Sequence, residues 1–295
     1  MAISPGDFDS VLERLAKTHD FVSLAEAMSP SQHQRVAVTF DDGYADNLVT
    51  AAPILQARAI PASFFIATGF IDTQLLFPPD AMDGFFSSPA EATPSPWTQA
   101  IRSRGYWEAL EGLAALKEPQ YWAELNHLSR MVRGEMLEAD PLRRPLTLPE
   151  LRTLAAIKGF TLGPHTHSHR RMSVIDTEDA LADIAHSVRW LQTRGLASTD
   201  FLAYPFGQKE DISPNLTAAI REQGFEPLTT LPVISSATTR RIFAPLGVAR
   251  LSVGPAEIPL FSFLLRVLPF ASRVPRVWLA LLALRRRLTT PRTRH

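Results

Sequence analysis

Two short segments, far apart in the chain, carry side chains that bind metal ions in proteins. The first is Asp41-Asp42-Gly43, and the second is His165-Thr166-His167-Ser168-His169. One carboxylate and two imidazoles, such as His165 and His169, form a common ligand set for a divalent metal that keeps positions open for water. The other carboxylate would then be free to act as a base on that water. The residue types alone therefore point to a metal site that activates water.

Each segment taken alone has a simpler explanation. Asp-Asp-Gly after a strand is most often a turn with a capping aspartate, and a cluster of histidines occurs in solvated loops that bind metal only adventitiously. The two segments together favour a shared site, because each follows a predicted strand. The ends of sheet strands are where α/β proteins place their chemistry.

The elements that must position these side chains alternate between strand and helix. The apolar run 36–40 reads as a buried strand, 47–58 as an amphipathic helix and 62–66 as the next strand. This order predicts a parallel pair of strands with a right-handed crossover. The alternation resumes with a helix over 149–159, a strand over 160–163 before the histidines, a helix over 176–194 and a strand over 200–204. A helix over 213–223 and strands over 228–231 and 248–251 complete it, and short helices over 9–18 and 24–28 precede it.

Residues 74 to about 146 interrupt this alternation. Proline-rich stretches near 77–79 and 89–96 read as loops, and the pattern from Trp97 to Met136 is helical. We interpret this region as a partly helical insertion near the mouth of the site. The alternative is a spacer that only packs on the surface.

Composition limits the class of protein. The chain has 295 residues, of which 45% are hydrophobic and 20% charged, so it is long enough for one large α/β domain or two ordinary ones. Thirty basic and thirty acidic residues give a formal net charge of zero, which argues against a nucleic-acid partner. The absence of cysteine excludes disulfides, thiolate metal ligands and a cysteine nucleophile.

The last forty residues differ from the rest of the chain. Residues 256–295 contain eight arginines and one glutamate, a formal charge of +7. Pro259, Pro269 and Pro275 divide its apolar part into short segments, none as long as the roughly 20 residues that span a bilayer. We therefore predict a helical tail whose segment 257–288 lies on an anionic membrane surface. A helical segment packed on the strand-and-helix fold of the preceding residues is the alternative.

The N-terminus carries neither the basic segment nor the apolar run of a signal peptide. We therefore expect a cytoplasmic protein that lies peripherally on the inner face of the membrane.

The two metal half-sites and the segments around them resemble the polysaccharide deacetylases, which form carbohydrate esterase family 4 and share the NodB-homology domain. Segment 39–43 looks like the first motif of that family, His165-Thr166-x-x-His169 like the second, and Tyr204-Pro205-Phe206-Gly207 like the end of the third. Segment 61–65 is similar to the strand that usually follows the first helix. The resemblance runs from about Val36 to Leu251 and skips the insertion.

This resemblance implies a distorted, incomplete (β/α) barrel of about seven strands, with the partly helical insertion and the helical C-terminal tail added to it. Residues 1–255 would be the catalytic domain. Carried over by position, Asp42, His165 and His169 would hold a divalent metal, with zinc as the default and cobalt or nickel as alternatives. Asp41 would be the base, and the backbone N–H of Phe206 would stabilise the oxyanion.

Two features depart from the family pattern. The third motif usually starts with an arginine that orients the base, whereas this chain has Ala203 there, and Arg250 is our candidate replacement. The late Leu-x-His motif that supplies the acid is missing, because no histidine occurs between His186 and His295. His167 is the candidate acid within the second motif.

We therefore expect a metal-dependent hydrolase that removes an N-acyl group, commonly acetyl, from an amino sugar. Its substrate would be a glycan or a lipid-linked sugar. The alternatives are a deformylase or amidase acting on another C–N bond, and a non-catalytic carbohydrate-binding protein with a decayed site.

Overall fold

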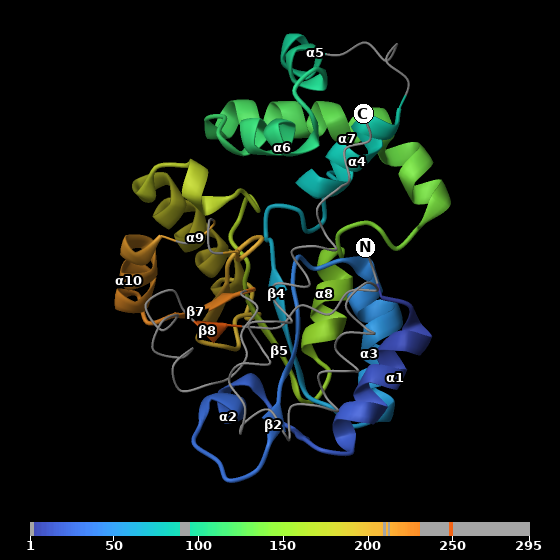
Figure 1. Ribbon diagram of the computed structural model, residues 1–295, viewed down its shortest axis with the longest axis vertical. Coiled ribbons are helices and arrows are strands. Elements are labelled where there is room, and N and C mark those ends of the chain that lie inside the picture. The colour runs from blue at the N-terminus through green and yellow to red at the C-terminus, as the bar shows by residue number, and fades with distance from the viewer. Residues whose placement is uncertain (1–2, 89–94, 209–210, 212, 231–247, 250–295) are drawn as a thin grey trace, which may run out of the picture.

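The computed structural model describes residues 3–88, 95–208, 211, 213–230 and 248–249. Figure 1 shows a central set of strands with helices on both sides and a group of helices above one end of the strands. The predictions for Arg250 and for the tail 256–295 fall outside the described residues. The division into a domain 1–255 and a tail therefore stays a prediction.

Three parallel strands carry the two segments of interest. β3 (Val38–Phe40) pairs with β4 (Ala62–Ile66), and β4 pairs with β5 (Phe160–Pro164), in the order β3-β4-β5. The expected parallel pair on either side of the first crossover is therefore confirmed. The predicted strand 36–40 is divided, because Arg35–Val36 forms β2 and pairs with β1 (Asp20–Phe21) in a separate sheet.

A third sheet contains β6 (Phe201–Ala203), β7 (Glu226–Thr229) and β8 (Val248–Ala249), again parallel. Within the described residues the strands thus form three separate sheets of two, three and three strands. The fold class α/β is confirmed, whereas a continuous barrel is not formed by the described pairings. The reason is local, since most of these strands are only two to four residues long and leave gaps in the ladder.

Helices cover the strands at the positions that the sequence predicts. α1 (Pro5–Ala16), α3 (Ala52–Ala57) and α8 (Leu148–Ala155) lie on one side, and α9 (Thr177–Gln192) and α10 (Pro214–Glu222) on the other (Figure 1). α2 (Leu24–Met28) is capped by Ser23, whose side chain accepts a hydrogen bond from Glu26 N–H. The predicted helix 47–58 starts as a π-helical turn, Asn47–Ala51, before α3. The N-cap of α9, Asp176, makes no side-chain cap hydrogen bond, and the acidic residues Glu178 and Asp179 lie in its first turn.

In the described part of the insertion, which omits residues 89–94, four helices lie above the carboxyl ends of the strands: α4 (Pro78–Ser87), α5 (Pro96–Arg102), α6 (Tyr106–Ala114) and α7 (Glu118–Ala139). The long helical pattern breaks at Gly105, whose φ of 95° favours glycine, and at Pro119 in the first turn of α7. These helices bury a hydrophobic cluster of their own, including Phe77, Phe85 and Leu125. The insertion is therefore a packed layer.

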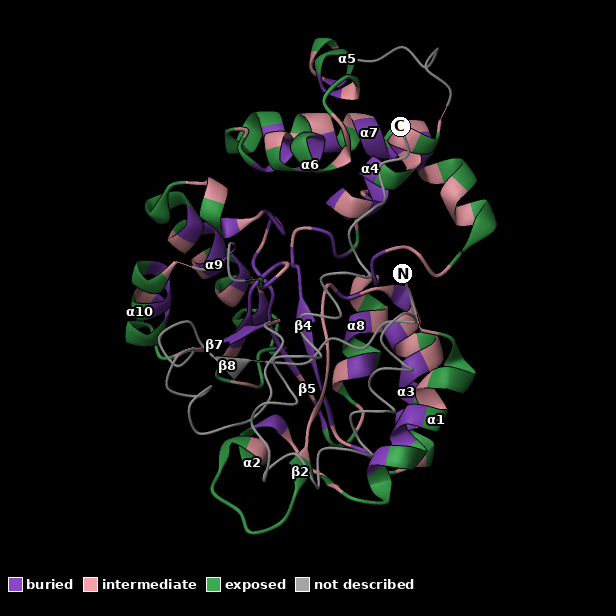
Figure 2. Cartoon of the chain, in the orientation of Figure 1, coloured by how far each residue is buried: buried purple, intermediate pink, exposed green. Residues whose placement is uncertain are grey.

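Two hydrophobic cores meet at the ends of the strands. The first packs Phe64 of β4 with residues of α3 and α8, and it includes Leu55, Leu151 and Leu154. The cluster of the insertion continues into the strand layer through Ala67 and Phe70, directly after β4. Figure 2 shows this continuity as buried residues along the strands and the facing sides of the helices. Helices in the described part of the chain are all too short or too polar to cross a membrane.

Candidate metal centre

Asp42 sits in a tight turn at the end of β3. Asp42 and Gly43 have φ values of 72° and 94°, a conformation that aspartate tolerates and glycine favours. The turn is fixed from two sides, because Ala67 N–H donates to the Asp42 carbonyl and Leu146 N–H donates to the Gly43 carbonyl. The end of the insertion thus helps to hold the turn, and Tyr44 pairs with Pro145 in an isolated antiparallel bridge.

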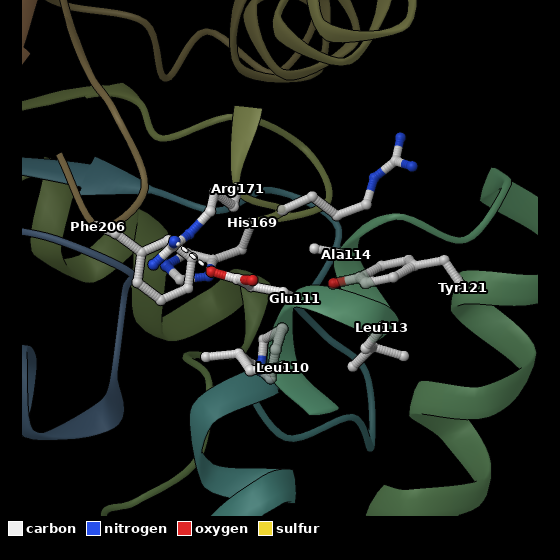
Figure 3. A pocket seen from close by; sticks show the side chains of 10 residues that line it. Leu110, Glu111, Leu113, Ala114, Tyr121, His169, Arg171 and Phe206 are labelled. Carbon is white, nitrogen blue, oxygen red and sulfur yellow. Dashed lines mark hydrogen bonds and ion pairs between the residues drawn. The ribbon is translucent and has the colours of Figure 1, made fainter. Parts of the chain in front are cut away.

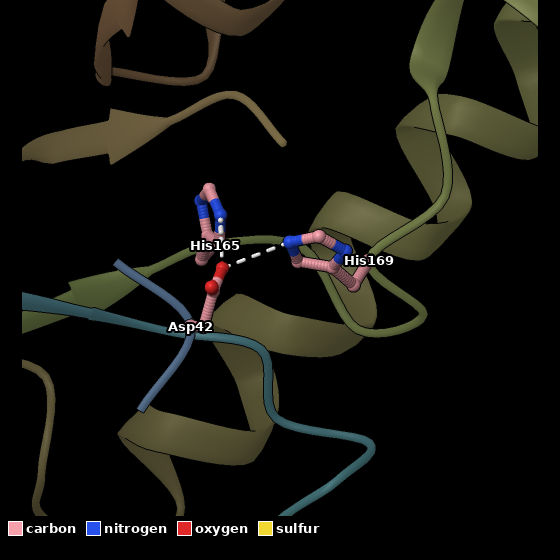
Figure 4. A group of neighbouring side chains, drawn as sticks. All are labelled: Asp42, His165 and His169. Atoms are coloured by element: carbon pink, nitrogen blue, oxygen red, sulfur yellow. Dashed lines mark hydrogen bonds and ion pairs between the residues drawn. The ribbon is translucent and has the colours of Figure 1, made fainter. Parts of the chain in front are cut away.

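His165 and His169 lie on the loop that follows β5. His165 N–H donates to the carbonyl of Ile66 at the end of β4, which brings the loop beside the Asp42 turn. Thr166 and His169 both have positive φ, and the Thr166 hydroxyl accepts a hydrogen bond from His169 N–H at 3.1 Å. The loop turns sharply between the two histidines, so both rings face the same aspartate (Figure 4).

The three side chains converge on one point. Nε2 of His169 and Nε2 of His165 lie 2.8 and 3.1 Å from the same oxygen, Oδ1 of Asp42. One candidate ligand atom from each residue lies within 4.8 Å of the other two, and both histidines are buried. The predicted ligand set, separated by more than 120 positions in the sequence, is therefore gathered into a single cluster.

The hydrogen bonding of His165 suits a metal ligand. Its Nδ1 lies 2.8 Å from the carbonyl oxygen of Ala203, which only accepts, so Nδ1 carries the proton. The neutral ring then points the lone pair of Nε2 at the Asp42 carboxylate. Two acceptor atoms repel each other at this distance, so the contact is favourable only with a proton or a cation between them. A carbonyl that fixes the tautomer is the usual support of a metal-binding histidine. Nδ1 of His169 is buried and has no such partner among the described residues.

The electrostatics of the cluster favour a cation. Burial by itself raises the pKa of Asp42, but the imidazoles of His169 and His165 outweigh it and bring that pKa well below its ordinary value. Burial lowers the pKa of His165, whereas the charges of Asp41 and Asp42 raise it, and the net pKa is raised. The donor set of one carboxylate and two imidazoles therefore fits a divalent metal.

Of the other predicted site residues, Asp41 and Phe206 lie beside the metal cluster, whereas His167 does not. Asp41 adjoins the cluster, since its charge acts on His165. Phe206 also lies there, because its ring centroid is 5.4 Å from that of His169. His167 points elsewhere, stacking on His186 at 3.7 Å and pairing through Nδ1 with the Thr68 hydroxyl.

A second group of contacts, not anticipated from the sequence, holds the histidine loop from behind. Asp183 on α9 is buried and accepts hydrogen bonds from His167 N–H at 2.6 Å, from Ser168 N–H at 3.2 Å and from the Ser168 hydroxyl. Arg170 donates to the Ser168 hydroxyl, and Tyr121 of α7 donates to the Ser168 carbonyl. The signal in the sequence was an acidic residue between Ala180 and Ile184, on the apolar face of α9.

The insertion closes one side of the site. A cavity of about 10 Å³, room for roughly one water molecule, is lined by residues that include His169, Phe206 and Arg171 (Figure 3). Arg171 lies over the Phe206 ring and pairs at 2.9 Å with Glu111 of α6 and at 2.9 Å with buried Asp211. Helix α6 therefore lies against the metal cluster, as expected for an insertion near the mouth of the site.

The fold and the cluster define an α/β protein with a candidate metal site at the carboxyl ends of parallel strands. Residues 29–228 match the family model of the polysaccharide deacetylases. The chain belongs to the polysaccharide deacetylase family.

Solved structures of similar fold include deacetylases. The Streptococcus pyogenes deacetylase PplD, solved in complex with acetate, superimposes with a TM-score of 0.52 at 18% identity, covering 86% of this chain and 82% of that chain. A de-N-acetylase from Aggregatibacter actinomycetemcomitans gives a TM-score of 0.50 at 15% identity, covering 88% and 89%. At 18% and 15% identity, the similarity to these two structures shows a common fold and nothing about activity. None of the curated proteins that were compared matches the chain significantly.

Proposed function

We propose that this protein is a metal-dependent hydrolase that removes an N-acyl group, most simply acetyl, from an amino sugar of a glycan. The single observation that carries this proposal is the convergence of His165 and His169 on one oxygen of Asp42. Family membership supports the reaction class, and the acetate held by the PplD structure is the product that such a reaction releases.

Asp42, His165 and His169 would hold the metal, for which we propose zinc, with cobalt and nickel as alternatives. When bound, a divalent metal supplies a Lewis acid that lowers the pKa of water and polarises an acyl carbonyl.

The protein's own residues would then move the proton and hold the charge. Asp41 would accept a proton from water as the water oxygen attacks the carbonyl carbon. The C–N bond then breaks, and the same proton, returned by Asp41, goes to the leaving amine. Phe206 N–H would donate to the oxyanion, a contribution of about 2.7–4 kcal/mol in comparable sites. The contacts of His167 with His186 and Thr68 make it a weaker candidate for the acid than Asp41.

The basic tail supports a more specific proposal, in which the glycan is membrane-associated, such as a lipid-linked sugar. We also infer that the separate sheets are parts of one distorted (β/α) barrel, because the family pattern implies it. The cytoplasmic location stays a prediction.

Two variants test the catalytic proposal. Asp42→Asn keeps a residue that tolerates the positive φ but removes the charge, so we expect loss of stoichiometric metal and a loss of activity of at least about 100-fold. Asp41→Asn should retain the metal and lose activity by about 100-fold or more. Metal analysis and release of acetate from N-acetylglucosamine oligomers measure both effects.

An unmutated protein that binds no divalent metal, or an Asp41→Asn variant as active as the parent, would contradict the proposal. N-formylated and N-acetylated forms of the same sugar, assayed side by side, separate a deacetylase from a deformylase.

A further inference from the structure

An open groove of about 410 Å³ lies beside the histidine loop, on the side of His167. Its walls come from three segments: the connection after β4, helix α7 of the insertion, and His167 itself. This volume is within the range of roughly 300–1,000 Å³ that is typical of small-ligand sites. The groove therefore has room for a ligand next to, and separate from, the metal cluster.

Trp122 of α7 forms a fixed aromatic wall of this groove. Its indole packs against Phe70, Tyr121 and His167, with ring centroids 5.7, 4.9 and 5.7 Å away. It also lies so close to Gly69 that a Cβ there would be 2.7 Å from the indole carbon Cη2. Trp122 nevertheless remains partly exposed. Because the indole is already held in place, a ligand that packs on it pays little for loss of side-chain conformational entropy.

The exposed polar groups of the groove are two amides, and the partly buried side chains of Thr73 and His167 also line it. Gln74 and Asn126 line it and are exposed, and each amide offers both donors and an acceptor. No lysine, arginine, aspartate or glutamate is among the described residues that line the groove. This lining does not match an anion such as a phosphate group, which basic side chains would bind.

A pyranose ring matches both features. Its C–H groups pack on the negative face of an aromatic ring, and its hydroxyls exchange hydrogen bonds with side-chain amides. The buried ring of Phe70 contacts the rings of both Trp122 and His169, so one side chain connects the aromatic wall of the groove to the metal cluster.

We propose that the groove between Trp122, Gln74 and Asn126 binds a neutral sugar unit that adjoins the N-acylated sugar in the same glycan. This inference rests on the proposed function, because the ligand is the rest of that substrate. It makes helix α7 of the insertion a determinant of specificity for chain length.

The test is binding and turnover of N-acetylglucosamine oligomers of one to five units, in both β-1,4 and β-1,6 linkage. Calorimetry on the full-length Asp41→Asn protein, which we expect to leave the ligand intact, measures affinity. KM and kcat of the otherwise unmutated protein measure turnover. We expect longer oligomers to bind more tightly than the monomer. Trp122→Ala should weaken oligomer binding and raise the KM for oligomers about tenfold, with a smaller effect on the KM for the monomer. Trp122→Phe should partly restore the oligomer affinity.

Trp107→Ala is the matched control, because Trp107 lies on α6 of the same insertion and is 63% exposed. Metal affinity is measured for each variant, since Trp122 touches Phe70 beside His169. If Trp122→Ala also loses metal, the double variant Gln74→Ala/Asn126→Ala tests the groove instead, because both positions are exposed. We expect it to bind oligomers more weakly than the parent does.

Oligomer binding that depends on Trp122 without any turnover would support the groove and refute the hydrolase. Turnover that is independent of chain length and unaffected by these variants would refute the groove and leave the hydrolase. A protein that binds none of the oligomers would refute the groove.

Discussion

Asp183 shows how one buried carboxylate can support a metal site that it does not touch. Its two oxygens receive the backbone N–H groups of His167 and Ser168 and the Ser168 hydroxyl. These bonds hold the loop in which Thr166 and His169 adopt positive φ. Without them the two imidazoles would lose their fixed direction towards Asp42.

We predict that Asp183→Asn lowers metal affinity by about 10–100-fold, the usual effect of losing an outer partner of a metal ligand. It should also destabilise the fold by about 1–3 kcal/mol, because the amide nitrogen cannot accept these hydrogen bonds. Competition with a chelator measures the first effect, and urea unfolding the second.

Asp179→Asn is the control, because Asp179 lies on the same helix and forms an exposed ion pair with Lys117. Equal metal affinity in the Asp183→Asn and Asp179→Asn proteins would show that the loop keeps its shape without the buried carboxylate.

At the scale of elements, helix α8 links the insertion to the Asp42 turn. Glu150 caps α8 with Thr147 and receives two hydrogen bonds from Arg144, at 2.7 and 2.8 Å. Arg144 in turn offers its carbonyl to Ala45 N–H, two residues beyond Gly43. The hydrogen bonds from Arg144, followed by those from Thr147, lower the pKa of Glu150 from 4.5 to about 2 against the opposing effect of burial.

A lowered pKa in the folded state predicts a definite pH dependence. The carboxylate of Glu150 stabilises the protein above about pH 4.5, and this contribution is lost as the pH falls towards 2. We expect Glu150→Gln to lower the free energy of unfolding by about 2 kcal/mol at pH 7, allowing for the exposed part of the side chain. The difference from the parent should shrink as the pH falls below 4.5.

Urea unfolding across this pH range tests the prediction. Glu135→Gln, at an exposed position of α7, should match the parent at every pH. A Glu150→Gln difference that stays constant down to pH 3 would exclude the ion pair as its cause.

At the scale of the whole molecule, charge is divided unevenly along the chain. The +7 of residues 256–295 is offset by −7 in the remainder, so the neutral total conceals a basic tail. Attraction of such a tail to an anionic surface is worth about 1 kcal/mol per basic residue and is screened by salt. A membrane-directed tail would bring the domain to a lipid-linked substrate.

Deletion of residues 257–295 should abolish binding to phosphatidylserine vesicles, and neutral vesicles should bind neither protein. In the full-length chain, replacement of Arg285, Arg286 and Arg287 by alanine should weaken the binding, and added salt should weaken it further. Co-sedimentation measures all of these effects. Undiminished binding of the truncated protein would disprove a membrane role for the tail.

The sequence by itself determined the elements and the chemical nature of the site. Strand 62–66, the parallel pair that it forms with β3, and the ligand set Asp42, His165 and His169 were all readable, because they depend on local periodicity and on side-chain chemistry. The tertiary structure alone decided what surrounds them. Three contacts join segments separated by 16 to more than 50 residues: Asp183 behind the loop, Arg171 over Phe206, and Trp122 beside Gly69. A local pattern can mark a buried acidic residue such as Asp183, but its partners depend on how the helices pack over the strand ends, which local periodicity does not encode.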